Sequence, residues 1–259
     1  MMKKMDNISP QNIIKLKNSR KITMITAYDF VSGHIVNNSD ADMILVGDSL
    51  GTTTLGYDFT NKVTIEDMLR ATASISRVGI NKLLVSDMPF KTYETKKSAL
   101  ENGLKLMNAG AHAVKLEGGI EKYEIINFLV ENNIPVMGHI GIKPQSINKT
   151  SDYKIIGKNH TEENTVFEDA AFIESSGAFS VVLELVDSYL SKKITEHLSI
   201  PTIGISSGDF TDGQVQVYND LIGYSATKLP KHAKVYSNLF EKAQQSINAF
   251  VDETKKESK

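Results

Sequence analysis

Eight apolar segments of strand length recur along this chain, and they alternate with segments patterned like helices. We place these strands at Ile22–Thr26, Met43–Val46, Leu83–Ser86, Ala113–Leu116, Val136–Gly138, Ser180–Leu183, Thr202–Ile205 and Gln214–Val217. Such alternation is typical of βα units that build a parallel sheet. The chain has 259 residues, and an α/β barrel commonly takes about 200–250 residues as one domain. The sequence therefore predicts an α/β fold.

Local signals set the expected boundaries of the helices. Thr64 and Thr161 each precede acidic residues, as helix-capping residues do. Gly79, Gly110 and Gly177 fall where helices should end. Nothing resembling a linker divides the chain, so we predict one domain over residues 1–259. It begins with a polar extension and a short helix near residues 11–17, and it ends in a charged, frayed tail over residues 252–259.

Composition and charge exclude several classes of protein. The chain has no cysteine, which rules out disulfide scaffolds, cysteine-ligated metals and thiol catalysis. Its 29 basic and 31 acidic residues give a formal net charge of -2, which offers no general attraction for nucleic acid or anionic lipid. No apolar run approaches the roughly 18 residues of a membrane span, and no signal-peptide core follows the first residues. We expect a cytoplasmic protein with no nucleic-acid or membrane partner.

Ionisable residues stand at or just past the carboxyl ends of five successive predicted strands. They are Asp48, Asp87, Glu117, His139 and Glu184. An open doubly wound sheet gathers its ligands at one switch point, so only two or three strand ends should carry such groups. A closed barrel brings every carboxyl end to one mouth. The pattern therefore favours a single (β/α)8 TIM barrel with its site at that mouth.

Two of these residues, Asp48 and Asp87, are carboxylates released from an apolar strand into a turn. Carboxylates without cysteine or histidine neighbours suit a hard divalent cation, and Mg²⁺ is the expected one. A lone aspartate after a strand also commonly caps a helix or a turn. Both interpretations stand at this point.

Lys115 and Glu117 lie two residues apart, so strand periodicity puts them on one face. They could form an ion pair in the barrel lumen, or Lys115 could hold a substrate carboxylate. His139, flanked by glycines, is either a structural histidine or a catalytic one. Glu184 interrupts an apolar stretch and must be paired, ligated or raised in pKa. A raised pKa would suit a general base for a carbon acid.

Two loops are further candidates for function. Residues 143–160 are rich in glycine and polar residues, and long loops inside compact folds are often functional. The segment Ser206-Ser207-Gly208 after the seventh strand could cradle a phosphate, although short turns of this composition are common. The chain lacks the glycine-rich fingerprints of dinucleotide and nucleoside triphosphate binding.

An ordered set of motifs resembles the ketopantoate hydroxymethyltransferase family. The set includes Gly47-Asp48-Ser49, Asp87-Met88-Pro89, Lys115-Leu116-Glu117-Gly118-Gly119, Gly138-His139-Ile140-Gly141, Pro144-Gln145-Ser146, Val182-Leu183-Glu184 and Asp212-Gly213-Gln214. Each motif alone is weak, but their order is highly specific. The resemblance covers roughly residues 21–236.

This resemblance implies a Mg²⁺-dependent barrel enzyme. It would move a one-carbon unit from 5,10-methylenetetrahydrofolate to C3 of 3-methyl-2-oxobutanoate, giving 2-dehydropantoate for pantothenate biosynthesis. Carried over by motif, Asp48, Asp87 and Glu117 would bind the metal. Asp48, Ser49, Asp87, Lys115 and His139 would contact the oxo acid, and Glu184 would accept the proton. The family's enzymes are cytoplasmic homo-oligomers, often decamers.

The chain departs from the family's usual sequence at three places. It has Ser206-Ser207-Gly208 where Gly-Ala-Gly is usual, Asp187 where proline is common, and Ser151-Asp152 where a glycine pair is usual. Two alternatives to the transferase stay open at this point. One is a Mg²⁺-dependent lyase or mutase of the phosphoenolpyruvate mutase and isocitrate lyase type, and the other is a barrel without catalytic activity.

Overall fold

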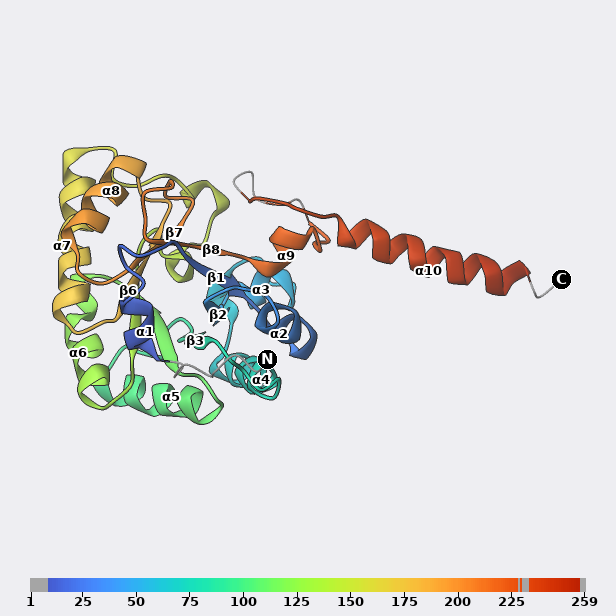
Figure 1. Ribbon diagram of the computed structural model, residues 1–259, viewed down its shortest axis with the longest axis horizontal. Coiled ribbons are helices and arrows are strands. Elements are labelled where there is room, and N and C mark those ends of the chain that lie inside the picture. The colour runs from blue at the N-terminus through green and yellow to red at the C-terminus, as the bar shows by residue number, and fades with distance from the viewer. Residues whose placement is uncertain (1–8, 228, 230–232, 257–259) are drawn as a thin grey trace. The chain divides into compact units, whose positions relative to one another are not determined.

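Eight strands close into a barrel in the order in which they follow one another along the chain (Figure 1). This computed structural model describes residues 9–227, 229 and 233–256. The strands are β1 (Ile22–Thr26), β2 (Met43–Val46), β3 (Leu83–Asp87), β4 (Ala113–Glu117), β5 (Val136–Gly141), β6 (Ser180–Glu184), β7 (Thr202–Ile205) and β8 (Gly213–Gln216). Consecutive strands from β1 to β8 pair in parallel. The predicted (β/α)8 barrel is confirmed.

Four strands, β3 to β6, extend further toward the barrel mouth than the apolar runs suggested. β3, β4 and β6 each include the ionisable residue that we had placed at or past the strand end. β5 continues to Gly141, because its backbone pairs with β6 as far as Glu184. His139 therefore lies within β5, two residues before its end. The last strand starts and ends one residue earlier than predicted.

Helices and short 3-10 turns connect the strands. The helices are α1 (Pro10–Ile14), α2 (Phe30–Asn37), α3 (Leu50–Thr53), α4 (Ile65–Ser76), α5 (Lys96–Asn108), α6 (Tyr123–Glu131), α7 (His160–Ser175), α8 (Ser188–His197), α9 (Tyr218–Ile222) and α10 (Leu239–Lys256). The 3-10 turns are η1 (Thr60–Lys62), η2 (Ile120–Lys122), η3 (Pro144–Ser146) and η4 (Thr150–Asp152).

The predicted helix signals are confirmed with one exception. Thr64 caps α4 in a reciprocal capping box with Asp67. The glycines predicted to end helices follow α4, α5 and α7 with φ angles of 76°, 111° and 91°. Such left-handed geometry costs glycine no Cβ clash. Thr161 was the wrong cap for α7, because the side chain of Asn159 accepts the hydrogen bond from Glu162 N.

The barrel lumen changes from apolar to polar along β3, β4, β5 and β6. Its lower part is a buried cluster to which Val85, Ala113, Met137 and Val182 contribute. Side chains two positions further along share the same face. They are Asp87, Lys115, His139 and Glu184. Ile13 of α1 belongs to the same apolar cluster. Strand periodicity therefore places the ionisable groups at the mouth, above an apolar floor.

The chain divides into two compact units, Met1–Val215 and Gln216–Lys259. The second unit contains α9 and α10, and α10 includes residues 252–256 of the tail that we expected to be frayed. Residues 257–259 of that tail and residues 1–8 of the polar extension lie outside the described residues. The single-domain assignment remains a prediction. Within the described part of the chain, no helix is both long and apolar enough to cross a membrane.

Candidate active site

Two aspartates lie side by side at the ends of β2 and β3. The backbone N–H of Asp48 donates to Oδ2 of Asp87 over 2.9 Å, and both residues are buried. Neither carboxylate caps the helix that follows, because the N-cap positions are Ser49 for α3 and Thr95 for α5. The helix-cap interpretation therefore does not explain the two aspartates.

A lysine on β4 faces these aspartates. Lys115 Nζ lies 3.1 Å from Asp87 Oδ1. Burial lowers the pKa of Lys115, but the charges of Asp87, Asp48 and Glu117 more than offset this effect and raise the pKa above its usual value. Burial also raises the pKa of Asp87 to about 7, although the charge of Lys115 opposes the rise. Lys115 is therefore a fixed cation at this end of the lumen.

His139 lies between Lys115 and Glu184, the last of the five ionisable residues. Its Nδ1 lies 3.1 Å from Lys115 Nζ, and its Nε2 lies 3.2 Å from Glu184 Oε2. Burial, together with the charge of Lys115, lowers the pKa of His139 well below its usual value, so the ring is neutral. An ammonium group only donates hydrogen bonds, so Nδ1 is the acceptor and the proton resides on Nε2, facing Glu184.

The two glutamates differ in their access to solvent. The side chain of Glu117 is 3 % exposed, and its Oε2 accepts the backbone N–H of Gln145 at 3.1 Å. Burial and then the charge of Asp48 raise the pKa of Glu117 well above its usual value. The side chain of Glu184 is 18 % exposed. Glu184 is the most exposed of the five ionisable groups and is thus the one placed to meet a molecule arriving from solvent.

The raised pKa of Glu117 predicts a pH-dependent stability. The folded protein keeps a proton that the unfolded chain releases above about pH 4.3, so stability falls as pH rises from there toward the folded-state pKa. Glu117→Gln has the same shape and no proton to lose. In EDTA, we expect this variant to gain free energy of unfolding relative to the parent between about pH 5 and pH 8. Urea denaturation at about pH 5 and pH 8 measures the free energy of unfolding, with exposed Glu168→Gln as the control. If Glu117→Gln differed from the parent by the same free energy at both pH values, the prediction would be wrong.

The structure brings together all the predicted site residues. Ser49 lies beside them at the barrel mouth, where its hydroxyl is 2.8 Å from the Tyr28 hydroxyl. Sequence reasoning missed Tyr28, Tyr93 and Gln145 as members of the site. Gln145 stood in the motif Pro144-Gln145-Ser146, but nothing local in that motif showed which carboxylate it would reach.

The carboxylates fit a hard divalent cation, although they do not form a preformed cage. In the described part of the chain, no three histidine, aspartate or glutamate side chains are arranged to hold a metal ion. Oε1 of Glu117 is buried and accepts no hydrogen bond among the described residues. Mg²⁺ is commonly held by one or two carboxylates, with water and substrate oxygens completing its octahedron. Asp48 and Asp87 supply such a pair, with Glu117 nearby.

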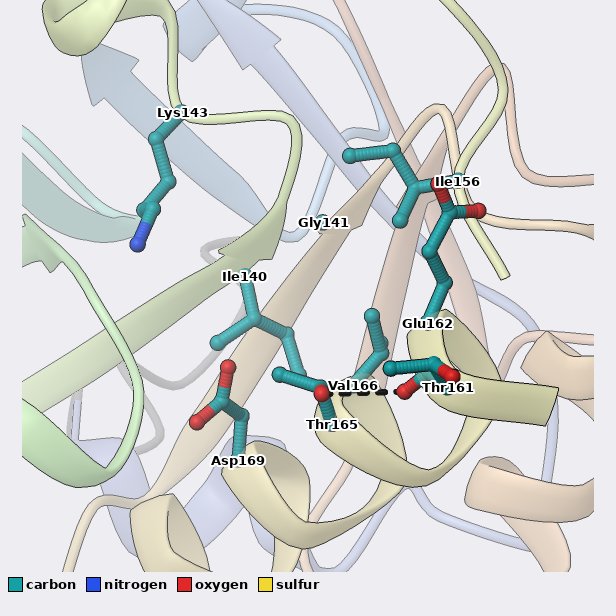
Figure 2. A pocket seen from close by; sticks show the side chains of 9 residues that line it. All are labelled: Ile140, Gly141, Lys143, Ile156, Thr161, Glu162, Thr165, Val166 and Asp169. Atoms are coloured by element: carbon teal, nitrogen blue, oxygen red, sulfur yellow. Dashed lines mark hydrogen bonds between the residues drawn. The ribbon is translucent and has the colours of Figure 1, made fainter. Parts of the chain in front are cut away.

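A separate cavity of about 210 Å³ lies outside the lumen (Figure 2). One wall comes from Ile140 and the loop after β5, and the other comes from α7 between Thr161 and Asp169. Ile140 follows His139 directly, so it points to the opposite face of β5. None of the five ionisable groups lines this cavity or a second one of about 420 Å³ beside α8. The candidate site is the barrel mouth.

Comparison with known proteins identifies the family. The sequence profile of ketopantoate hydroxymethyltransferase matches residues 7–258. This chain belongs to that family. It is 45% identical over 247 residues to the 3-methyl-2-oxobutanoate hydroxymethyltransferase of Thermotoga maritima, covering 95% of this chain and 92% of the relative. The Thermosipho africanus enzyme of the same name is 44% identical over 247 residues, covering 95% and 93%. The resemblance inferred from the motifs is confirmed.

Solved structures with the same fold belong to another group of barrel enzymes. A 2,3-dimethylmalate lyase of the phosphoenolpyruvate mutase and isocitrate lyase superfamily has a TM-score of 0.60 and 13% identity, covering 80% of each chain. Phosphonopyruvate hydrolase in complex with oxalate and Mg²⁺ has a TM-score of 0.62 and 11% identity, covering 97% of this chain and 88% of that one. At such identities the likeness shows the fold alone.

Two departures from the hydroxymethyltransferase family's usual sequence have a structural account. Asp187 caps α8, where its Oδ1 accepts from Tyr189 N at 3.0 Å and Leu190 N at 3.3 Å. The buried hydroxyl of Ser207 donates to Leu183 O and accepts from Val186 N. These bonds bracket Glu184 and a left-handed residue, Leu185, with φ 51°. In this chain Ser207 therefore supports the turn that carries Glu184. Nothing in the structure explains Ser151-Asp152.

Proposed function

We propose that this chain is a 3-methyl-2-oxobutanoate hydroxymethyltransferase. It transfers a hydroxymethyl group from 5,10-methylenetetrahydrofolate to 3-methyl-2-oxobutanoate and forms 2-dehydropantoate. The observation that carries the proposal is the constellation at the barrel mouth, where partly exposed Glu184 stands beside a buried lysine and three buried carboxylates. Membership of the family supplies the substrate class.

The oxo acid carries a carboxylate and a keto oxygen, and the site offers partners for both. Lys115 is a buried cation that neutralises the substrate carboxylate. Ser49, at the start of α3, donates a hydroxyl hydrogen bond to the oxo acid. His139 orients Lys115, whose Nζ lies 3.1 Å from its Nδ1. Asp48 and Asp87 would hold the cation on the side of the site that receives the oxo acid. With the carboxylate at Lys115, C3 of the substrate would face Glu184, the most exposed of the five ionisable groups.

Asp48 and Asp87 would hold Mg²⁺, with Glu117 completing the carboxylate set. When bound, the cation supplies a Lewis acid that stabilises negative charge on the keto oxygen of the oxo acid. The chain's own residues prepare for this: the N–H of Asp48 fixes the carboxylate of Asp87, and Lys115 balances the buried negative charge. The fit rests on two adjacent aspartates and a glutamate oxygen without a hydrogen bond.

Glu184 is the proposed general base. Its carboxylate takes the C3 proton of the oxo acid, and the electron pair of that C–H bond moves into the enolate. The enolate carbon then attacks the methylene carbon of the folate and forms the new C–C bond, while one of that carbon's two C–N bonds breaks and leaves its electron pair on nitrogen. Water then supplies the hydroxyl oxygen as the second C–N bond breaks, which releases 2-dehydropantoate and tetrahydrofolate. Nε2 of the neutral His139 ring lies 3.2 Å from Glu184 Oε2, next to the carboxylate that takes the proton. General base catalysis of this kind contributes about 10²–10⁴-fold to a rate.

The remaining parts of the proposal are the partners and the location. Both substrates are small molecules, and we propose no nucleic-acid or membrane partner. A homo-oligomer, for which the decamer is the family's frequent form, and a cytoplasmic location stay predictions.

The decisive experiment is an assay with both substrates, with and without Mg²⁺. We expect 2-dehydropantoate to form only when the oxo acid, methylenetetrahydrofolate and Mg²⁺ are all present, and EDTA should abolish turnover until Mg²⁺ is restored. Turnover of an oxo acid without folate would instead support a lyase or mutase. Calorimetry showing that neither Mg²⁺ nor the oxo acid binds would favour a barrel without catalytic activity.

A further inference from the structure

Gln145 touches two of the three proposed metal ligands from a loop that the mechanism does not otherwise use. It lies in the 3-10 turn η3, between β5 and α7. Its side-chain Nε2 donates to Asp48 Oδ2 at 2.8 Å, and its backbone N–H donates to Glu117 Oε2 at 3.1 Å. One residue therefore restrains one oxygen of each carboxylate.

The side-chain amide of Gln145 has its orientation fixed by its partners. Besides Asp48, Nε2 donates to the carbonyl of Met88 at 3.0 Å, so the amide has two acceptor-only neighbours. On the other side, the hydroxyl of Tyr93 donates to Oε1 at 2.6 Å. A flipped amide would face both acceptors with its oxygen and lose the bonds to Asp48 and Met88. The residue is 2 % exposed, so water does not replace these partners.

The loop around Gln145 is anchored independently of these hydrogen bonds. Ile142 and Ile147 lie on either side of the turn and form a buried apolar cluster with Leu185. Asn61 also donates to the carbonyl of Ile147. Replacing the side chain of Gln145 should therefore leave the loop in place, with its backbone bond to Glu117, while it releases the carboxylate of Asp48.

We propose that Gln145 is a positioning residue that holds Asp48 and Glu117 in the arrangement that binds the divalent cation. This inference rests on the proposed function, because it assigns the cation to these carboxylates. Hydrogen bonds that restrain one oxygen of a carboxylate reduce its rotational freedom and leave the other oxygen for the metal. For Glu117 that second oxygen, Oε1, is the one that is buried without a hydrogen bond.

The test is to titrate the full chain with Mn²⁺ in the absence of substrates. The electron paramagnetic resonance signal of free Mn²⁺ measures how much remains unbound. Gln145→Met keeps the length of the side chain and removes its hydrogen bonds. We expect it to bind Mn²⁺ about 10–100-fold more weakly, the usual effect of losing a partner behind a metal ligand. Ser146→Ala, an exposed position in the same turn, is the matched control and should bind like the parent. Tyr93→Phe removes one anchor of the amide and should give a smaller loss.

A second measurement separates positioning from general damage. In the two-substrate assay, Gln145→Met should need more Mg²⁺ for half-maximal rate and should recover most of the parent rate when Mg²⁺ saturates. Equal Mn²⁺ affinity in the parent, Gln145→Met and Tyr93→Phe would overturn the role of Gln145 and leave the proposed function intact. A parent chain that binds no Mn²⁺ would overturn the metal site itself, and the inference with it. Tyr93→Phe keeps the test decisive if Gln145→Met does not fold.

Discussion

Glu184→Gln is expected to lose about 10²–10⁴-fold in the rate of deuterium exchange at C3 of 3-methyl-2-oxobutanoate, because the amide cannot accept the C3 proton. The exchange needs no folate, so it isolates proton removal from carbon–carbon bond formation. Nuclear magnetic resonance in deuterated water with Mg²⁺ follows the loss of the C3 proton signal. Because glutamine has the same shape as glutamate and Glu184 is partly exposed, the fold should survive.

Two controls make this result specific. Glu168→Gln changes an exposed glutamate on α7 and should exchange at the parent rate. Binding of the oxo acid to Glu184→Gln, measured by calorimetry with Mg²⁺, should stay within a few-fold of the parent, since Glu184 acts on the proton and Lys115 on the carboxylate. Unchanged exchange in Glu184→Gln would remove this residue as the base.

Lys115→Met should be the most destabilising of the substitutions at the site. The change leaves the buried Asp87 carboxylate without the ammonium group that lies 3.1 Å away. Removing one partner of a buried pair costs about 3–5 kcal/mol in free energy of unfolding. The loss should be smaller below the pKa of Asp87, where the carboxyl is neutral in the folded protein and needs no counter-charge. Urea denaturation at about pH 8 and pH 5, in EDTA, measures both effects.

The same variant tests the substrate-binding role of Lys115. Loss of a charged hydrogen-bonding partner should weaken oxo-acid binding by about 1.5–3 kcal/mol in binding free energy. Calorimetry under conditions where the variant is folded gives this number. Lys105→Met, an exposed lysine on α5, is the matched control, and its free energy of unfolding should stay within about 0.5 kcal/mol of the parent. If Lys115→Met kept the parent stability and affinity, Lys115 would be neither a counter-charge nor a substrate ligand.

The barrel could be predicted because its signals are local. Each apolar run lies on one strand. The ionisable residue at the end of a run can be recognised from that segment alone, without knowing which other residues it contacts. Because successive side chains of a strand point to opposite faces, the spacing of Lys115 and Glu117 already placed both on one face of their strand. Boundaries were less accurate where pairing with a neighbour extends a strand, as in β5, whose Gly141 pairs with Glu184. The cap of α7 was misplaced because Asn159 and Thr161 are both good capping residues.

Periodicity and the order of the motifs were enough to predict the barrel and the family, both of which are confirmed, and to point to polar groups at the strand ends. How these polar groups meet depends on the tertiary structure. Gln145 reaches Asp48 across 97 residues of sequence, and the tautomer of His139 follows from the lysine beside Nδ1. The greater exposure of Glu184 is likewise a property of the assembled mouth. Contacts between distant segments depend on the packing of whole strands and loops, which no local pattern encodes.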